Sequence, residues 1–152
     1  MRLILYTLLL FFFPSSFEGK VVGVKDGDTI QVLIDGQSQT IRLLDIDCPE
    51  KNQAFGQKAK KFTSDFCFGK NIKIETNGKD RYGRYLGTVH INGQNLNKAL
   101  VKAGLAWHYK HFSKDQEYAE LENEARAKKV GLWIDPNPIA PWDFRKQKLN
   151  AK

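Results

Sequence analysis

Short strand patterns joined by tight turns fill the first third of this chain and limit the folds open to it. Apolar Ile30, Val32 and Ile34 occupy alternate positions, and the Asp35-Gly36 pair that follows is a strong hairpin signal. Because a further strand pattern returns after this turn, three strands are expected to form an antiparallel meander. Their predicted bounds are Lys20–Lys25, Ile30–Ile34 and Thr40–Ile46.

Helix and strand patterns alternate along the rest of the chain. A helix is predicted over about Gln53–Phe68, since Phe55, Phe62 and Phe66 recur on one helical face and Gly69 fits the position after its end. The order of elements, β-β-β-α-β-β-α-α, predicts an α+β fold in which a five-stranded OB-like β-barrel packs with three α-helices. The later elements are strands over Asn71–Thr76 and Tyr85–Ile91, a helix capped by Asn95 and closed by Gly104, and a helix that starts at a Ser113–Gln116 capping box and ends before Gly131.

The first 17 residues are typical of a signal peptide. Arg2 supplies a positive start, an apolar run from Leu3 to Phe13 follows, and Pro14 breaks it. The run is too short for a membrane-spanning helix, which needs about 20 residues. We therefore expect cleavage near Ser16–Glu18 and a secreted or periplasmic protein, with an uncleaved N-terminal membrane anchor as the alternative.

One domain, over residues 18–135, is expected between this signal peptide (residues 1–17) and a C-terminal tail. The tail, residues 136–152, combines three prolines with Trp142, Phe144 and several basic side chains. It is expected to be either an irregular strap whose Trp142 docks on the domain or a disordered basic end.

Charge and cysteine content restrict the partners and the chemistry. The chain has 24 Lys and Arg against 17 Asp and Glu, and its formal net charge of +7 suits a polyanion such as nucleic acid or an anionic membrane. A soluble protein without such a partner can be equally basic. Cys48 and Cys67 are expected as free buried thiols, with a disulfide between them as the alternative. The histidines His90, His108 and His111 are too few and too scattered to indicate a zinc site.

Three short motifs carry acids and arginines in a pattern that suits metal-assisted phosphodiester cleavage. A hard divalent cation binds carboxylate and carbonyl oxygens, a phosphate in its transition state accepts hydrogen bonds from arginine, and an attacking water needs a nearby carboxylate. Each motif alone is compatible with an ordinary turn. The motifs are Asp26-Gly27-Asp28-Thr29, the segment Ile41–Glu50, and Asp80-Arg81-Tyr82-Gly83-Arg84.

In this order and at this spacing, the three motifs resemble the staphylococcal (thermo)nuclease family, and the likeness runs from about Gly19 to Trp133. The resemblance implies an OB-fold barrel with three helices. It also implies a Ca²⁺-dependent nuclease that hydrolyses DNA and RNA with little sequence preference and leaves 3′-phosphates. One Ca²⁺ ion would be the only cofactor, and the enzyme would act as a monomer without stable insertion in a membrane.

The same resemblance assigns roles to individual residues. The metal ligands would be Asp28, Asp47 and the main-chain oxygen of Cys48, and Asp26 would hydrogen-bond a water on the metal. Glu50 would activate the attacking water, either as a general base or by orienting it. The phosphate clamps would be Arg42 and Arg84, and the substrate-binding residues would be Lys79, Arg81, Tyr82 and Tyr109.

Two observations qualify the resemblance. The segment between Glu50 and Gly56 is shorter than the lysine-bearing mobile loop of the best-known family members, so substrate positioning and turnover are expected to differ. A non-catalytic nucleic-acid-binding OB-fold module and a basic envelope protein are the alternative functions. The presence of all five residues on which the chemistry depends favours the enzyme. These residues are Asp28, Arg42, Asp47, Glu50 and Arg84.

Overall fold

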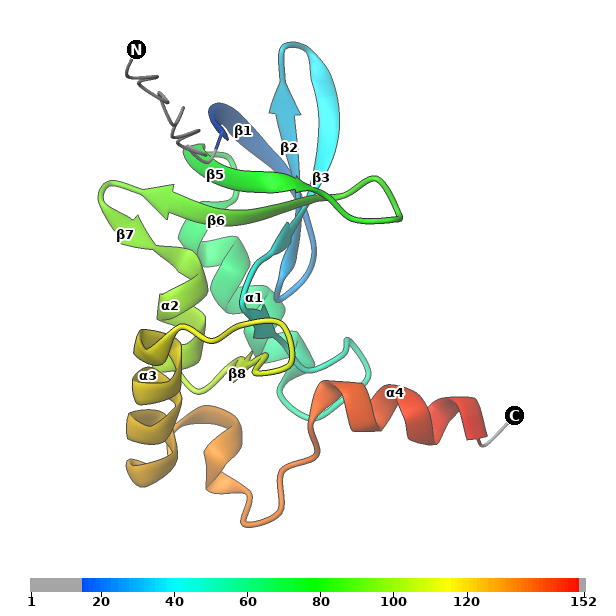
Figure 1. Cartoon of the computed structure of the whole chain (residues 1–152), viewed down its shortest axis with the longest axis vertical. Coiled ribbons are helices and arrows are strands. Elements are labelled where there is room, and N and C mark those ends of the chain that lie inside the picture. The colour runs from blue at the N-terminus through cyan, green and yellow to red at the C-terminus, as the bar shows by residue number, and fades with distance from the viewer. Residues whose placement is uncertain (1–14, 151–152) are drawn as a thin grey trace, which may run out of the picture.

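A closed five-stranded barrel forms one end of the molecule, and helices cover its other end (Figure 1). The computed structural model describes residues 15–150. The strand order is β3-β2-β1-β5-β6, and a parallel pairing of β3 with β6 closes the ring, while all the other pairings are antiparallel. This confirms the predicted α+β barrel. The barrel strands are β1 (Ser15–Asp26), β2 (Thr29–Ile34), β3 (Gln37–Leu43), β5 (Asn71–Lys79) and β6 (Tyr85–Ile91).

The barrel interior is built from the alternate apolar residues that the sequence pattern indicated. Ile30 and Val32 of β2 are fully buried, whereas Leu33 between them is exposed. Burial of a β-branched or leucine side chain contributes roughly 1.5–3 kcal/mol, so this inner face accounts for much of the stability of the barrel. Other fully buried side chains of the core are Val21, Ile41, Ile74, Val89, Leu96 and Leu100.

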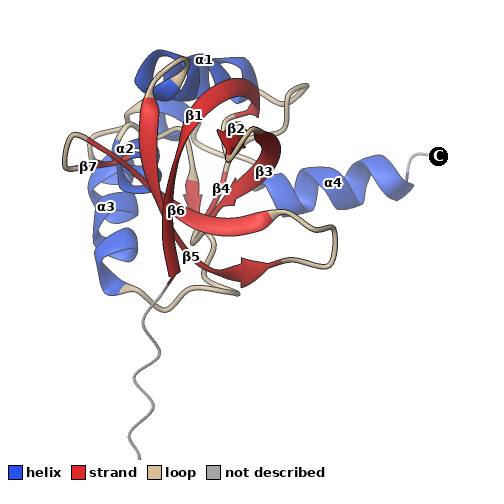
Figure 2. Ribbon diagram, turned by 90° about the horizontal axis from the view of Figure 1, so that it is seen from above, coloured by secondary structure: helices blue, strands red, loops and turns tan. Residues whose placement is uncertain are grey.

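Helices α1 (Gly56–Cys67) and α2 (Leu96–Lys102) pack against each other and against the barrel strands β1 and β6, and α3 (Gln116–Ala127) packs on α2 (Figure 2). The side chain of Asn95 caps α2, accepting a hydrogen bond from the amide of Lys98 at 2.9 Å. The shorter elements are β4 (Ile46–Asp47), β7 (Gln94–Asn95), β8 (Trp107–His108) and the 3₁₀ helix η1 (Gly131–Ile134).

Several predicted boundaries are wrong: β1 begins at Ser15 instead of Lys20, and β5 ends at Lys79 instead of Thr76. Three further differences have a local reason. The helix expected from Gln53 begins at Gly56, because the preceding residues form a tight turn. The strand expected over Thr40–Ile46 is split into β3 and β4 by Asp45, whose φ of 66° is left-handed. The cap of α3 is Asp115, not Ser113: the Asp115 carboxylate accepts from the amide of Glu117 at 2.9 Å.

The C-terminal tail forms a fourth helix, α4 (Pro141–Asn150), which none of the alternatives anticipated. Pro141 stands at its first position, where a proline ring is preorganised for a helix. The predicted docking of Trp142 is correct, since its ring packs on Trp107 and Tyr109. The far end of α4 points away from the domain in both views (Figures 1 and 2).

The structure describes only the last part of the predicted signal peptide. Residues 1–14, which hold most of the predicted signal peptide and its anchor alternative, lie outside the described residues, while Ser15, Ser16 and Phe17 belong to β1. Phe17 packs edge-on against Tyr85 with ring centroids 5.0 Å apart. Within residues 15–150, no helix is both long enough and apolar enough to span a bilayer. Cys48 and Cys67 are both buried and free, as expected.

Candidate active site

The turn between β1 and β2 places Asp26 and Asp28 over the start of α1. The Thr63 hydroxyl of α1 donates a hydrogen bond to the carbonyl of Gly27 at 2.5 Å. A Cβ atom at Gly27 would lie 2.7 Å from that of Ala59 and 2.9 Å from the sulfur of Cys48. Only glycine fits this close approach, which explains the Asp-Gly-Asp order of the motif.

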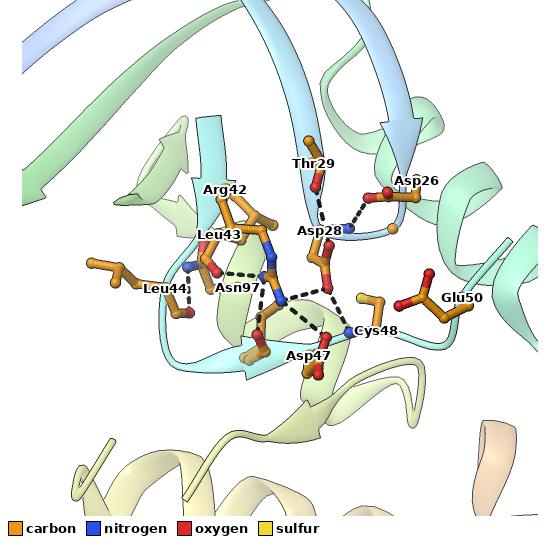
Figure 3. A network of polar contacts seen from close by, with 12 residues as sticks. Asp26, Asp28, Thr29, Arg42, Leu43, Leu44, Asp47, Cys48, Glu50 and Asn97 are labelled. Atoms are coloured by element: carbon orange, nitrogen blue, oxygen red, sulfur yellow. Dashed lines mark hydrogen bonds and ion pairs between the residues drawn. The ribbon is translucent and has the colours of Figure 1, made fainter. Parts of the chain in front are cut away.

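A hydrogen bond between backbone and side chain joins this turn to β4. The amide of Cys48 donates to Oδ2 of Asp28 at 2.6 Å, and this contact sets Asp47 beside Asp28 (Figure 3). Both aspartates are almost completely buried, at 5% and 1% exposure. The structure therefore brings together the two carboxylates that the motifs predicted to be neighbours.

Arg42 on β3 contacts both aspartates (Figure 3). Its Nη2 donates to Oδ1 of Asp47 at 3.0 Å and lies 3.2 Å from Oδ2 of Asp28. Its Nη1 donates to the carbonyls of Leu43 at 2.8 Å and Ile46 at 3.0 Å. These three hydrogen bonds fix the course of the chain from β3 to β4, and the ion pair holds Asp28 beside it.

Asn97 of α2 holds the same β3–β4 segment from the opposite side, and sequence reasoning did not single it out. Its Nδ2 donates to the carbonyls of Leu44 at 3.0 Å and Gly87 at 3.2 Å. Its Oδ1 accepts from the amide of Val89 at 3.1 Å. The side chain is fully buried, so it replaces water as the partner of three backbone groups.

Glu50 stands on the short loop before α1, and this loop is tightly organised. The amide of Glu50 donates to Oε1 of Gln53 at 3.1 Å, and its carbonyl accepts from the amide of Gln53 at 2.8 Å. A Cβ atom at Gly56 would lie 1.9 Å from that carbonyl. The Gln53 side chain also donates to the carbonyl of Ile139 at 2.6 Å, which ties the loop to the C-terminal tail.

A second arginine, Arg145 of α4, reaches the same carboxylates. Its Nη1 donates to Glu50 at 2.7 Å, and its Nη2 donates to Oδ2 of Asp47 at 2.7 Å. Sequence reasoning missed this residue, because it lies in a tail expected to be irregular and far along the chain from the motifs. The only sequence signal was an arginine three residues after the tryptophan that was predicted to dock.

The carboxylates exceed the cations in this cluster. Among the residues that the structure describes, two guanidinium groups, those of Arg42 and Arg145, face Asp26, Asp28, Asp47 and Glu50, which leaves two negative charges when all are ionised. Burial and the neighbouring charge of Asp28 raise the pKa of Asp26 to about 6. Burial also raises the pKa of Asp47, although both guanidinium groups act against the change. A divalent cation would supply the missing charge.

The donor set suits a hard cation such as Ca²⁺. Asp28 and Asp47 present oxygens close enough together to share one nitrogen of Arg42. Burial raises the pKa of the Cys48 thiol well above its usual range, so this residue offers its carbonyl rather than a thiolate. Within the described part of the chain, no three His, Cys, Asp or Glu side chains converge as a metal site. Water would therefore have to complete the ligand shell.

Arg84 stands apart from the carboxylate cluster. Its Nε donates to Oδ2 of Asp80 at 2.8 Å within the β5–β6 turn. The pKa of Asp80 is lowered from its usual value. Burial acts in the opposite direction, but the hydrogen bonds from the Arg84 side chain and from nearby amides outweigh it. The parallel pairing sets Arg42 opposite Leu86, two residues beyond Arg84. Arg84 therefore belongs to the same end of the barrel without touching Asp28 or Asp47.

The predicted substrate-binding residues lie in two places. Lys79, Arg81 and Tyr82 are on or beside the β5–β6 turn, where the Tyr82 side chain is 69% exposed and Arg81 packs 4.9 Å from its ring. Tyr109 is elsewhere, stacked at 5.2 Å and nearly parallel to Trp142. One face of the Tyr109 ring is thus already covered by α4.

Comparisons with known proteins agree with this geometry. The model of the family described as Staphylococcal nuclease homologue matches residues 40–135. An uncharacterized endonuclease of Haemophilus influenzae is 45% identical over 150 residues, which cover 97% of this chain and 84% of the relative. A micrococcal nuclease of Shigella flexneri is 41% identical over 148 residues, covering 90% and 85%. A staphylococcal-like nuclease of Arabidopsis thaliana is 44% identical over 108 residues, covering 71% of this chain and 33% of the relative.

Proposed function

The chain belongs to the staphylococcal nuclease family and is a nuclease, and from this premise we propose how it acts: it uses Ca²⁺ to hydrolyse phosphodiester bonds of both DNA and RNA, with little sequence preference, and leaves 3′-phosphates. The observation that carries the proposal is the pairing of Asp28 with Asp47 around one guanidinium, beside a third carboxylate on Glu50. Such an all-oxygen cluster with excess negative charge suits a calcium ion and an attacking water.

In the proposed reaction, each charged residue has a separate task. Asp28, Asp47 and the Cys48 carbonyl would hold Ca²⁺, and Asp26 would accept a hydrogen bond from a water on it. The bound cation would supply Lewis-acid charge to the phosphate. Glu50 would take a proton from the water that attacks phosphorus.

The arginines would stabilise the charge that develops on the phosphate. Arg42 and Arg84 would donate to its non-bridging oxygens as the new P–O bond forms and the bond to the 5′-oxygen breaks. The 5′-oxygen leaves with a proton from solvent, so the products are a 3′-phosphate and a 5′-hydroxyl. In this structure Nη2 of Arg42 donates to Asp47 and pairs with Asp28, so it would have to leave these carboxylates to donate to the phosphate.

Low sequence preference follows from the kind of contacts that the exposed residues offer. Lys79, Arg81 and Tyr82 lie on a surface turn, where they would attract the phosphate backbone and stack on any base. For Tyr109, stacking on a base is limited to the ring face away from Trp142. We also propose export by the N-terminal segment, to a secreted or periplasmic location, which mass determination of the mature N-terminus would test.

Digestion of plasmid DNA and of a structured RNA tests the proposal directly. Cleavage of both is expected with Ca²⁺, strongly reduced with Mg²⁺ because that ion demands stricter octahedral geometry, and abolished by a chelator. An Asp47→Asn protein serves as the inactive control, and end-group analysis of the fragments should find 3′-phosphates. Full cleavage in excess chelator would contradict the metal role, and 5′-phosphate ends would contradict the regiochemistry.

A further inference from the structure

Arg145 joins the carboxylate proposed to activate water with a carboxylate proposed to hold the cation. Its two terminal nitrogens donate separately, Nη1 to Glu50 at 2.7 Å and Nη2 to Asp47 at 2.7 Å, and Nη1 also lies 3.3 Å from Oδ1 of Asp47. The guanidinium is planar and rigid, so these bonds fix the separation and the relative orientation of the two carboxylates. Without it, two like charges would face each other at the edge of the cluster.

The position of Arg145 is set by the aromatic docking of α4. Trp142, one helical turn earlier, stacks on Tyr109 at 5.2 Å and meets Trp107 edge-on at 5.5 Å. The hydrogen bond from Gln53 to the carbonyl of Ile139 fastens the segment just before the helix. Arg145 is therefore held at a defined place even though its side chain is 42% exposed. The far end of α4 projects away from the domain (Figure 1), and the contacts of Trp142 and Arg145 with the domain come from the first half of the helix.

We propose that Arg145 is a positioning residue of the reaction: it orients Glu50 relative to Asp47 for attack on the phosphate. Helix α4 holds Arg145 in the place where it can do so. The inference rests on the proposed function, since it assigns Arg145 a task only if Glu50 activates water. Side chains that orient metal ligands through hydrogen bonds typically contribute about 10–100-fold in activity or metal affinity. Arg145 acts through the two carboxylates and needs no contact with substrate.

The test compares Arg145→Gln, Arg145→Lys and a matched control, Lys146→Gln, in the full chain with an oligonucleotide substrate. Lys146 is the next residue on the same helix and its partner is Asp143, so its substitution removes the same charge without touching the carboxylates. At Ca²⁺ concentrations shown by calorimetry to saturate each variant, Arg145→Gln should lower kcat about 10–100-fold and change KM by less than about fivefold. Arg145→Lys should recover part of the loss, since lysine keeps the charge but lacks the rigid fork.

Weakening the docking of α4 should also lower kcat, because Arg145 would no longer be held beside Glu50 and Asp47. Trp142→Ala should lower kcat, and the double variant Trp142→Ala/Arg145→Gln should be no slower than Arg145→Gln, because both changes remove one interaction. A wild-type kcat in Arg145→Gln, or tighter Ca²⁺ binding without a loss of kcat, would overturn the proposal and make Arg145 a competitor of the cation. A wild-type protein that cleaves no nucleic acid would instead refute the proposed function, so the two failures are distinguishable.

Discussion

Gly56 lies directly against the carbonyl of Glu50: a Cβ atom at that glycine would come within 1.9 Å of the oxygen. The short loop that carries Glu50 therefore closes only if residue 56 has no side chain. This contact explains how so short a loop holds its carboxylate in place.

Gly56→Ala should displace the backbone of Glu50 and lower both stability and turnover. Because the clash is with backbone, a destabilisation of roughly 1–3 kcal/mol is expected, with a fall in kcat beyond that of the unfolded fraction. Thermal melting and steady-state kinetics measure the two effects. Gly36→Ala is the control: the added methyl has open space there, and only the left-handed φ of 78° disfavours it. Equal behaviour of the two variants would show that the loop tolerates the methyl group.

Arg42→Lys and Arg84→Lys should separate transition-state binding from structural support. Each should lower kcat on the order of 10²-fold or more, because lysine loses the two-bond fork to phosphate. Only Arg42→Lys should also lower the melting temperature of the metal-free protein, since Arg42 donates to three acceptors of the β3–β4 segment and forms an ion pair with Asp28. Arg84 bonds Asp80 on a surface turn, and its variant should melt like wild type. Wild-type kinetics in either variant would exclude that arginine from contact with the reacting phosphate.

Glu50→Gln should leave the fold intact and lower kcat about 10²–10⁴-fold, the usual contribution of general-base catalysis. The amide oxygen of glutamine can still accept from Arg145, so the link to α4 survives. Calorimetry should still detect Ca²⁺ and nucleotide binding, and the melting temperature should stay within a few degrees. Glu120→Gln, on the exposed face of α3, is the matched control. Single-turnover cleavage at the wild-type rate by Glu50→Gln would refute the role.

Asn97→Ala should destabilise the protein by roughly 2–4 kcal/mol, because it leaves the amide of Val89 and the carbonyl of Leu44 without their partner, whereas the carbonyl of Gly87 keeps the amide of Leu44. Chemical denaturation without metal measures this change, and Asn77→Ala at an exposed position of β5 should have little effect. Asn97 holds Leu44 of the β3–β4 segment, which leads to Asp47. Ca²⁺ binding should therefore weaken as well. A stable Asn97→Ala protein would mean that water reaches these groups.

Local patterns predicted the barrel, and the resemblance carried by the three motifs predicted which carboxylates would share a site. The alternation of Ile30 and Val32 specified which strand face is buried, and the Asp-Gly-Asp turn placed Asp28 near Asp47 because both flank strand ends. Predictions failed where neighbouring residues offered equivalent signals. Ser113 and Asp115 are both good caps two positions apart, and only the packed structure decides between them.

The missed residues share a different cause. Arg145 meets Glu50 and Asp47 across 95 and 98 positions of sequence, and Asn97 meets Leu44 across 53. Periodicity and turn chemistry describe neighbours along the chain and contain no information on such distances. An arginine in a proline-rich basic tail is typical of a solvated charge. Only the docking of Trp142 in the folded protein brings Arg145 to Glu50 and Asp47.

The connection between the domain and α4 gives a way to lose the proposed chemistry without unfolding. Residues 134–137 of this connection are exposed, whereas the strands of the barrel and the four carboxylates precede them in the chain. A protease that cuts there would leave every strand of the barrel intact and would free Arg145 to leave Glu50 and Asp47. With the proposed role of Arg145, one broken peptide bond would then separate a folded protein from a working one.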